Sequence, residues 1–459
     1  MKSSSLAKLK SASLFAGTVA LVLLFGLLLI APTTTAQSDE VTLEIWDNHN
    51  SETRNPIVEA AIEKLKERHP NLKVKRTSRP LADIKSQIMP AVADEGGPDV
   101  MTVNAGEQMM GPLVRGDHIA NLEPYAEEYG WTEKLYSPSL WNRARYSEDG
   151  STIGTGNLYG VGFDGEMVGV YYNREIFEEH DLEVPQSIPE FEQVMDELKE
   201  AGVEPISIAG LKDYRIFHVY TLVQASVMSH YVGPNAAQDY LDSIVLEWDE
   251  EMTWVNAANE EAARMMQEWA ENGYFIEGYS GLGGTDDLEI FKAGEAAMFI
   301  QGSWYSADIA NSNVEAGFFP FPPYEKGETL PPQLGGMTTP TGINAHSDNQ
   351  DLAAEFLNIL ITSDETVELQ KEMSVLPARV PASLEGVEEG TLYYDLLETW
   401  NRVHEAGNVA HYLDWATPTM YETLANAGRE LLSQEITPTE FLEEIEADYR
   451  NWMEEKPSA

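Results

Sequence analysis

Hydrophobic positions in the first quarter of the chain repeat with two different periods. Val41 to Trp46 alternates as a strand does, and Asn55 to Arg68 has the apolar spacing of an amphipathic helix. Leu72 to Arg76 reads as a second strand, Leu81 to Ala93 as a second helix, and Asp99 to Val103 as a third strand. This order predicts βαβ units, and therefore a parallel sheet whose strands end at a common crevice.

Strand and helix patterns continue to alternate along the rest of the chain. Strands are predicted at Tyr159 to Phe163, Val168 to Asn173, Pro205 to Ala209 and Ala296 to Ile300. Helices are predicted at about Pro189 to Ala201, Phe217 to Met228, Ala236 to Ile244, Asn259 to Asn272, Leu352 to Thr362, Asp364 to Glu372, Thr391 to Glu405 and most of Thr417 to Trp452. Prolines in the segment 318–332 exclude a regular helix there. The predicted fold class is α/β.

The window Phe291 to Tyr305, FKAGEAAMFIQGSWY, predicts a helix end, a glycine turn, a short buried strand and an aromatic pair. Gly294 suits the positive φ of a helix C-terminus, and Gly302 lets the backbone turn where the strand ends. Trp304 would then stand at the crevice and offer a flat platform to a ligand. A core tryptophan fits the same window, and the window alone favours neither interpretation.

The N-terminal segment has the pattern of a secretory signal. Lys2, Lys8 and Lys10 precede an uncharged apolar run, and Thr34 and Ala36 supply the small residues for cleavage before Gln37. An uncleaved membrane anchor is the alternative. The sequence contains no cysteine, so a lipid-modified cysteine and disulfides are both excluded. We expect a protein secreted across the inner membrane, in the periplasm or at the cell exterior, that is not a lipoprotein.

The charge of the chain is extreme. It has 77 acidic and 29 basic residues among 459, a formal net charge of −48, and yet 43% of its residues are hydrophobic, which indicates a globular protein and not a disordered one. Nucleic acid and anionic membranes are excluded as favourable partners. We interpret the acidity as adaptation to high salt, where screening suppresses self-repulsion. An acidic extracellular protein without such adaptation is the alternative.

Sequence motifs give little support to an enzyme. The glycines of Gly160 to Gly165 match a dinucleotide fingerprint, but the β-branched and aromatic residues that follow predict a strand where that fingerprint needs a helix. Nucleophile elbows, Walker loops and paired zinc histidines are missing from the sequence, and no metal or cofactor is predicted. The two carboxylates of a glycoside hydrolase stay open, because they are defined by separation in space.

Aromatic residues suited to stacking on a sugar ring remain: Trp46, Trp254, Trp304, Trp415 and Tyr412. Asp, Glu, Asn and Arg side chains could bind the hydroxyl groups. Aromatic faces stack on the apolar faces of pyranose rings, and a few polar groups then select hydroxyl geometry.

Four windows together resemble the bacterial family 1 extracellular solute-binding proteins, the maltose- and oligosaccharide-binding components of ABC importers. They are GGPDVMTVNAG at 96–106, YGVGFDGEMVGVYYNREIF at 159–177, FKAGEAAMFIQGSWY at 291–305, and GGMTTPTGINAHSDNQDLAAEFLNILITSDE at 335–365. The resemblance implies a two-lobed periplasmic-binding-protein fold (type II-like). Each lobe would be a mainly parallel sheet flanked by helices, hinge-linked, with the ligand cleft between the lobes. After the signal peptide, 1–36, lobe one would comprise 37–160 and 341–381, and lobe two 161–340 and 382–459.

The resemblance also implies a ligand site. Trp304 matches a tryptophan that stacks on sugar, and Glu166 falls where the family often has a cleft acid. The full set of expected ligand-binding residues is Trp46, Asp47, Asn48, His49, Asn104, Glu107, Asp164, Glu166, Trp254, Trp304, Tyr305, Gly336, Met337, Arg379 and Trp415. Val103 and Asn104 stand where maltodextrin binders often place an aromatic residue, which argues against maltose itself.

The expected function is capture of a carbohydrate, an oligosaccharide in particular, and its delivery to a membrane permease by a monomer that performs no covalent chemistry. Three alternatives are kept. They are a secreted glycoside hydrolase or lyase, an uncleaved membrane-anchored sensory or adhesion domain, and the same fold carrying a polyol, a glycerophosphodiester or a compatible solute.

Overall fold

The first sheet is built from the βαβ opening and one returning strand. Its strands are β1 (Val41–Asp47), β2 (Leu72–Ser78), β3 (Val100–Thr102) and β11 (Thr341–Ile343), in the order β11-β3-β1-β2. In this computed structural model β1 and β3 are parallel, with Ile45 opposite Val100, and β11 is antiparallel to β3. The structure describes residues 41–93, 96–131, 138–211, 214–247, 251–407 and 409–456. The predicted signal peptide lies outside them.

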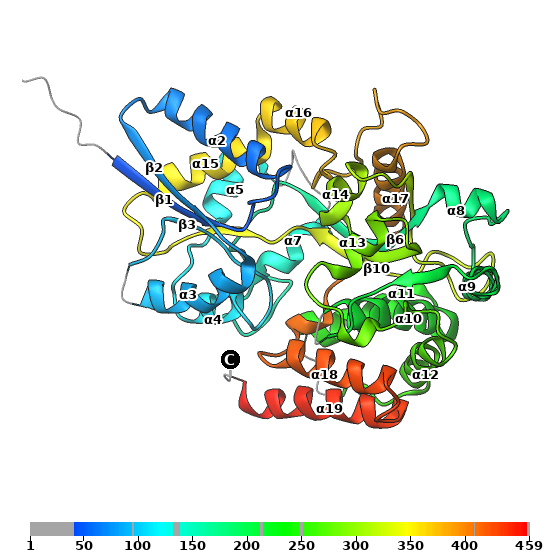
Figure 1. The fold of residues 1–459 in the computed structure, drawn as a ribbon. Coiled ribbons are helices and arrows are strands. Elements are labelled where there is room, and N and C mark those ends of the chain that lie inside the picture. The colour runs from blue at the N-terminus through cyan, green and yellow to red at the C-terminus, as the bar shows by residue number, and fades with distance from the viewer. Residues whose placement is uncertain are drawn as a thin grey trace, which may run out of the picture. The chain divides into compact units, whose positions relative to one another are not determined.

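Two amphipathic helices cover this sheet as the sequence pattern predicts. Helix α2 (Asn55–Arg68) buries its apolar stripe, including Ile57, Ile62 and Leu65, and packs against α15 (Gln350–Thr362). Figure 1 shows the two helices side by side, although nearly 300 residues separate them in the sequence. The chain segment after β10, residues 338–365, therefore returns to the first sheet.

The second sheet contains β6 (Gly165–Asn173), β7 (Glu204–Ser207), β8 (Ala296–Gly302), β10 (Gln333–Met337) and β12 (Val409–Ala410), in the order β12-β10-β6-β8-β7, with β9 (Ala316–Phe319) paired to β6. Strand β6 is antiparallel to β8, β9 and β10. The second sheet is thus mixed, where the resemblance implied a mainly parallel one. Antiparallel pairing places the start of β6 next to the end of β8, and both lie beside the cavity described below.

A helical layer packs on the second sheet. Helix α10 (Tyr214–Val232) is buried from Arg215 to Met228, and it packs against α11 (Pro234–Asp242), α12 (Ala257–Glu271) and α18 (Met420–Leu432). Helix α19 (Pro438–Glu455) packs on α12 and α18, and Figure 1 shows α18 and α19 running below α10. A helix with nearly all its faces buried is typical of the centre of a large core.

The remaining elements are short or lie at the edges of these layers. The helices are α3 (Leu81–Ala93), α4 (Met110–Arg115), α5 (Glu123–Tyr129), α7 (Pro138–Trp141), α8 (Arg174–Glu179), α9 (Ile188–Ala201), α13 (Asp286–Lys292), α14 (Ser306–Ala310), α16 (Asp364–Glu372) and α17 (Leu392–Ala406). Strands β4 (Arg145–Tyr146) and β5 (Asn157–Leu158) pair with each other. Single helical turns are η1 (Asn142–Ala144), η2 (Ser243–Glu247), η3 (Tyr279–Gly281), η4 (Ser303–Tyr305) and η5 (Leu413–Trp415).

The chain passes between the two sheets at three places that lie side by side. Val161 pairs with Thr341 through an isolated bridge, and Asp164 pairs with Pro377 through another. The predicted strand Tyr159 to Phe163 is therefore one of these passages and forms only an isolated bridge. Asp164 also hydrogen-bonds the segment after β10, because its carbonyl accepts from the Thr338 amide at 3.0 Å. Three paired segments of the chain therefore connect the two sheets.

Candidate functional site

A cavity of about 610 Å³ lies where residues near the edges of both sheets meet. Its lining comes from the β1–α2 loop, the start of α3, the loop after β3, the start of β6, helices α10 and α14, the exits of β8 and β10, and the turn η5 with the start of α18. The lining residues are Asn48, His49, Asn50, Ser51, Arg54, Pro80, Leu81, Asn104, Glu166, Tyr214, His218, Trp304, Tyr305, Asp308, Thr338, Thr339, Tyr412, Asp414, Trp415 and Tyr421. The volume falls in the range of small-molecule sites, about 300–1,000 Å³.

The β1–α2 loop is fixed from below by Asp47. Its carboxylate accepts hydrogen bonds from Arg76 Nε at 2.6 Å, from the Ser78 hydroxyl at 2.6 Å and from the His49 amide at 2.9 Å. Burial alone would raise the pKa of Asp47, but these hydrogen bonds and the neighbouring positive charge hold it below its usual value. Asp47 therefore stays ionised and orients the loop beneath the cavity.

His49 presents a neutral imidazole at the cavity wall. Burial lowers its pKa to about 4, so the ring carries no charge at neutral pH. Its Nε2 atom has no hydrogen-bond partner among the described residues, and neither has Oδ1 of Asn48 next to it. The ring packs edge-on against Phe163, with centroids 4.9 Å apart. Buried polar atoms are rarely left unpaired, so these two atoms are suited to hydroxyl groups of a ligand.

Trp304 lies on the wall formed by the exit of β8. The strand ends at Gly302, the turn η4 follows, and the indole is half-buried. Tyr214 and His218 of α10 hold it edge-on, each with a ring centroid 6.2 Å away. Helix α13 ends at Lys292 and Gly294 has φ +75°, as the window predicted. The indole thus lines a cavity and is not part of the fully buried core, and its role as a ligand platform stays a prediction.

Trp415 forms a second aromatic wall, supported from behind by a buried arginine. The Arg143 guanidinium lies 4.7 Å from the Trp415 ring centroid and 5.5 Å from that of Tyr412. It donates a hydrogen bond to Glu166 Oε1 at 2.7 Å and further hydrogen bonds to the carbonyls of Met337 and Gly335. A buried guanidinium needs this many acceptors, and the resulting contacts fix both the acid and the tryptophan.

Two further charged groups face the cavity. Arg54 at the start of α2 forms an ion pair with the fully buried Asp164, with Nε and Oδ2 2.6 Å apart. Asp414 in η5 is 8% exposed, and burial raises the pKa of its carboxyl to about 7. Loss of hydration on burial is the largest cause of that rise.

Seven of the expected site residues line the cavity: Asn48, His49, Asn104, Glu166, Trp304, Tyr305 and Trp415. They come from five separate chain segments. Bringing them together requires both sheets, which no local pattern shows.

Four other expected residues lie just behind the lining and act on it. Asp47 orients the β1–α2 loop, and Asp164 pairs with Arg54. The carbonyl of Met337 accepts from Arg143, and a Cβ at Gly336 would meet the Arg143 guanidinium. Gly336 has φ +135°, so glycine is needed at this close approach for its backbone as well.

The other four expected residues do not line the cavity. Trp46 donates to Glu44 at 3.0 Å and lies under the Arg79 guanidinium, and Glu107 forms an ion pair with Arg115 at 2.6 Å. Trp254 is fully buried and belongs to the core, because large aromatic rings release most water there. The Arg379 carbonyl accepts from the Trp400 indole at 3.1 Å.

Several lining residues were missed by the sequence reasoning: Arg54, Tyr214, His218, Asp308, Thr338, Asp414 and Tyr421. Tyr214 and His218 are four residues apart and so share one face of α10, but this spacing equally describes a core helix. The supporting Arg143 was missed as well, since a lone arginine in a loop-rich segment carries no pattern.

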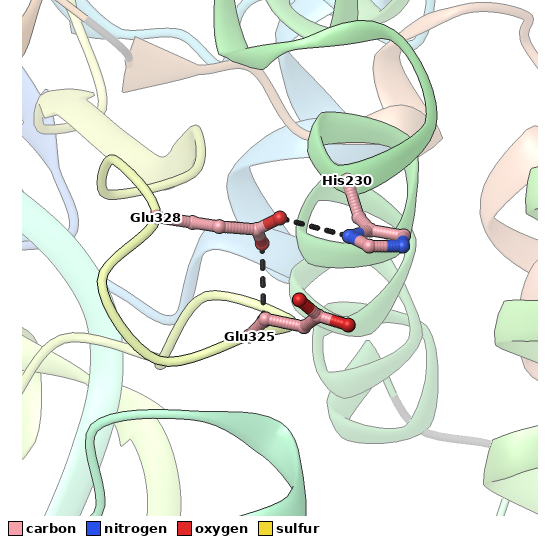
Figure 2. A group of neighbouring side chains, drawn as sticks. All are labelled: His230, Glu325 and Glu328. Carbon is pink, nitrogen blue, oxygen red and sulfur yellow. Dashed lines mark hydrogen bonds and ion pairs between the residues drawn. The ribbon is translucent and has the colours of Figure 1, made fainter.

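One group among the described residues has the composition of a metal site and lies away from this cavity. Figure 2 shows His230, Glu325 and Glu328, whose candidate ligand atoms lie within 4.8 Å of one another. All three side chains are exposed, and His230 Nδ1 is 2.8 Å from Glu328 Oε1. The His230 ring also stacks on Tyr324 at 4.5 Å. These contacts account for the group as an ion pair that holds the loop after Phe321 against α10.

Comparison with known proteins identifies the family to which the chain belongs. The family model of the bacterial extracellular solute-binding proteins matches residues 49–367, and the chain belongs to that family. A multiple sugar-binding protein of Streptococcus mutans is 24% identical over 340 residues, which are 72% of this chain and 73% of that protein.

Solved structures show the same fold. A chitin oligosaccharide binding protein superposes with a TM-score of 0.72 at 19% identity, over 90% of this chain and 99% of that one. A solute-binding protein in complex with raffinose superposes with a TM-score of 0.68 at 19% identity, over 90% and 99% of the two chains. The two-lobed α/β fold expected from the four windows is confirmed, with the mixed second sheet as its one departure.

Proposed function

We propose that this protein is the substrate-binding component of an ABC importer, which captures a carbohydrate in the cavity between its lobes and delivers it to a membrane permease. The observation that carries the proposal is the cavity itself, which has Trp304 and Trp415 in its walls and unpaired polar atoms of Asn48 and His49 beside them. Flat apolar surfaces combined with a few fixed polar groups suit a sugar ring. The names of the multiple sugar-binding relative and of the chitin-oligosaccharide and raffinose binders support the same class of cargo.

Capture requires no covalent step. Stacking on the indoles removes apolar faces of the sugar from water, while Asn48, Glu166 and Arg54 exchange hydrogen bonds with hydroxyls. Because the lining comes from both lobes, the ligand stabilises whichever arrangement lets both contact it at once. The proposed lobes are 37–160 with 341–381 and 161–340 with 382–459. They meet at the three paired passages.

The location and state of the protein form part of the same proposal. The signal is cleaved before Gln37, and the mature protein acts as a free monomer outside the inner membrane with no nucleic-acid partner. Within the part of the chain that the structure describes, no helix combines the length and the apolar character needed to span a bilayer. Sequencing the mature N-terminus tests the cleavage. The formal charge of −48 supports adaptation to high salt, and a melting temperature that does not rise in molar KCl would count against it.

Glycoside hydrolysis is the second candidate because of one observation. The cavity holds Glu166, ion-paired with Arg143, and Asp414, whose pKa burial raises to about 7. One ionised and one protonated carboxyl is the state that such hydrolases use. We expect no new reducing ends when oligosaccharides are incubated with the purified protein. Their appearance in the wild type, and their loss in Asp414→Asn, would favour the enzyme instead.

The experiment that tests the carbohydrate proposal has two stages. A thermal-shift screen against maltotriose, cellotriose, raffinose, triacetylchitotriose, polyols and betaines identifies a ligand, because a bound ligand raises the melting temperature. Calorimetry then compares Trp304→Ala with Tyr231→Ala, which removes an aromatic ring that is 54% exposed and lies outside the cavity lining. Trp304→Ala is expected to weaken sugar binding at least tenfold, about 1.4 kcal/mol, and Tyr231→Ala to leave it unchanged. Equal affinity of both variants for the sugar would remove the assignment.

A further inference from the structure

The charges around the cavity are not balanced. Among the described lining residues Arg54 is the cation, and its guanidinium already forms an ion pair with Asp164, which is fully buried beneath it. Glu166 is likewise matched by Arg143 at 2.7 Å. The opposite charges within each of these two ion pairs cancel. An anionic ligand would have to compete with a buried carboxylate for the one arginine available to it.

Two acids in the lining have no such match. Asp308 is exposed at the start of α14, and Asp414 is nearly buried in η5. Neither forms an ion pair among the described residues. Lys85 acts on Asp414 only through space, since its ammonium donates to Gln108. The cavity walls therefore carry an unmatched negative charge at Asp308, and a second one at Asp414 once the pH rises above its pKa of about 7.

The remaining titratable side chains do not offset this excess. His49 and His218 also line the cavity, and burial lowers their pKa values to about 4 and about 3, so both rings are neutral at pH 7. His218 adds an unpaired Nδ1 to the unpaired Nε2 of His49. Neutral imidazoles exchange hydrogen bonds with hydroxyls and supply no charge to a carboxylate or phosphate.

We infer that the cavity is selective for saccharides without negative charge, and that Asp308 and Asp414 enforce the exclusion of uronic acids, sulfated sugars and phosphodiesters. This inference rests on the proposed carbohydrate function and narrows it. Of the alternatives left open by the sequence, it removes the glycerophosphodiester and keeps neutral sugars and polyols. The physical reason is that an anion entering this cavity loses its hydration and meets like charge without gaining an unpaired cation.

The test compares probes that share a skeleton. Maltotriose, cellotriose and β-1,4-galactotriose are each compared by calorimetry at pH 8 with the counterpart in which the C6 hydroxymethyl groups are oxidised to carboxylates. The neutral member of a pair that binds should do so at least about tenfold more tightly than its oxidised partner. The double variant Asp308→Asn, Asp414→Asn should narrow the ratio of neutral to oxidised affinity at least about threefold, whatever its effect on the neutral affinity itself.

Controls separate the possible failures. Asp239→Asn removes the same charge from the exposed face of α11 and should leave the ratio unchanged. Asp308→Asn alone, at an exposed position, provides the comparison if the double variant does not fold. An oxidised probe that binds as tightly as its neutral partner overturns the inference but leaves the carbohydrate function standing. A ratio that the aspartate variants do not change removes the role of these residues. If none of these saccharides binds and the thermal-shift screen finds no other carbohydrate ligand, the carbohydrate function itself is rejected, and this inference with it.

Discussion

Replacing Gly302 with alanine tests the role of Trp304 without removing the indole. Gly302 is the last residue of β8, and its φ of −77° and ψ of 153° are extended values that any residue adopts. The space is the constraint. A Cβ at this position would overlap the six-membered ring of Trp304, well inside the carbon–carbon contact distance of about 3.5 Å. The ring must therefore leave its position on the cavity wall.

The expected loss follows from the area that stacking removes from water. A fully enclosed tryptophan buries about 150–250 Å², so one indole face against a sugar buries on the order of 80 Å². At about 25 cal/mol/Å² this is about 2 kcal/mol, or roughly thirtyfold in Kd. A displaced ring keeps part of the contact, and we expect Gly302→Ala to weaken binding about tenfold. Stability should change by no more than about 0.5 kcal/mol, because the indole is half-buried and can turn toward solvent.

Calorimetry with the sugar identified by thermal shift measures the affinity, and urea unfolding measures the stability. Gly281→Ala is the matched control, since a Cβ there meets no atom within 4 Å and its φ is not positive. Unchanged affinity in Gly302→Ala, in a protein whose Trp304→Ala variant has lost binding, would refute this account of how the ring is positioned. A large loss of stability would show that the indole is fixed by the core.

Three other substitutions test the supports of the site and of the fold. Asp414→Asn should gain stability relative to wild type as the pH rises from about 4 to 8, by up to about 4 kcal/mol, because the folded pKa near 7 lies above the unfolded value and ionisation of the buried carboxyl destabilises the fold. Urea unfolding at several pH values that shows a constant difference would contradict this. Arg143→Lys keeps the charge but loses the planar contacts with Trp415 and Glu166, so calorimetry should show weaker sugar binding and urea unfolding a loss of about 1–3 kcal/mol. If Arg143→Lys had the same sugar affinity and the same stability as the wild type, the planar geometry of the guanidinium would be unimportant. Thr437→Ala removes a capping box at the start of α19 and should cost about 1 kcal/mol in urea unfolding, with sugar affinity unchanged as its internal control.

Local patterns predicted many elements with correct bounds. Helices α2, α3 and α16 begin and end where the sequence indicated. Helices α2 and α3 bury an apolar stripe, and α16 begins after Ser363, whose side chain caps it. The strand expected at Tyr159 to Phe163 fails for the opposite reason. Its apolar residues pack at a passage between the lobes, where one isolated bridge takes the place of a ladder.

The candidate site was predictable only where a chain segment ends at the cavity. Trp304 follows the end of β8 and His49 follows the end of β1, so strand ends alone placed both near a crevice. Trp254 and Trp415 were both expected to bind ligand, but Trp254 is fully buried in the core and Trp415 lines the cavity. The residues next to each tryptophan in the sequence do not distinguish the two.

The sequence by itself determined the alternation of strands and helices, the acidic globular character and the Trp304 platform as one of two interpretations. Periodicity records which side of an element is apolar, and that information is local. The tertiary structure alone decided that β6 is antiparallel to its neighbours, that Arg143 supports Trp415 and Glu166, and that Asp414 is buried in the cavity wall. Each of these depends on which elements face each other across long separations in the chain, and the packing of both sheets together fixes that choice.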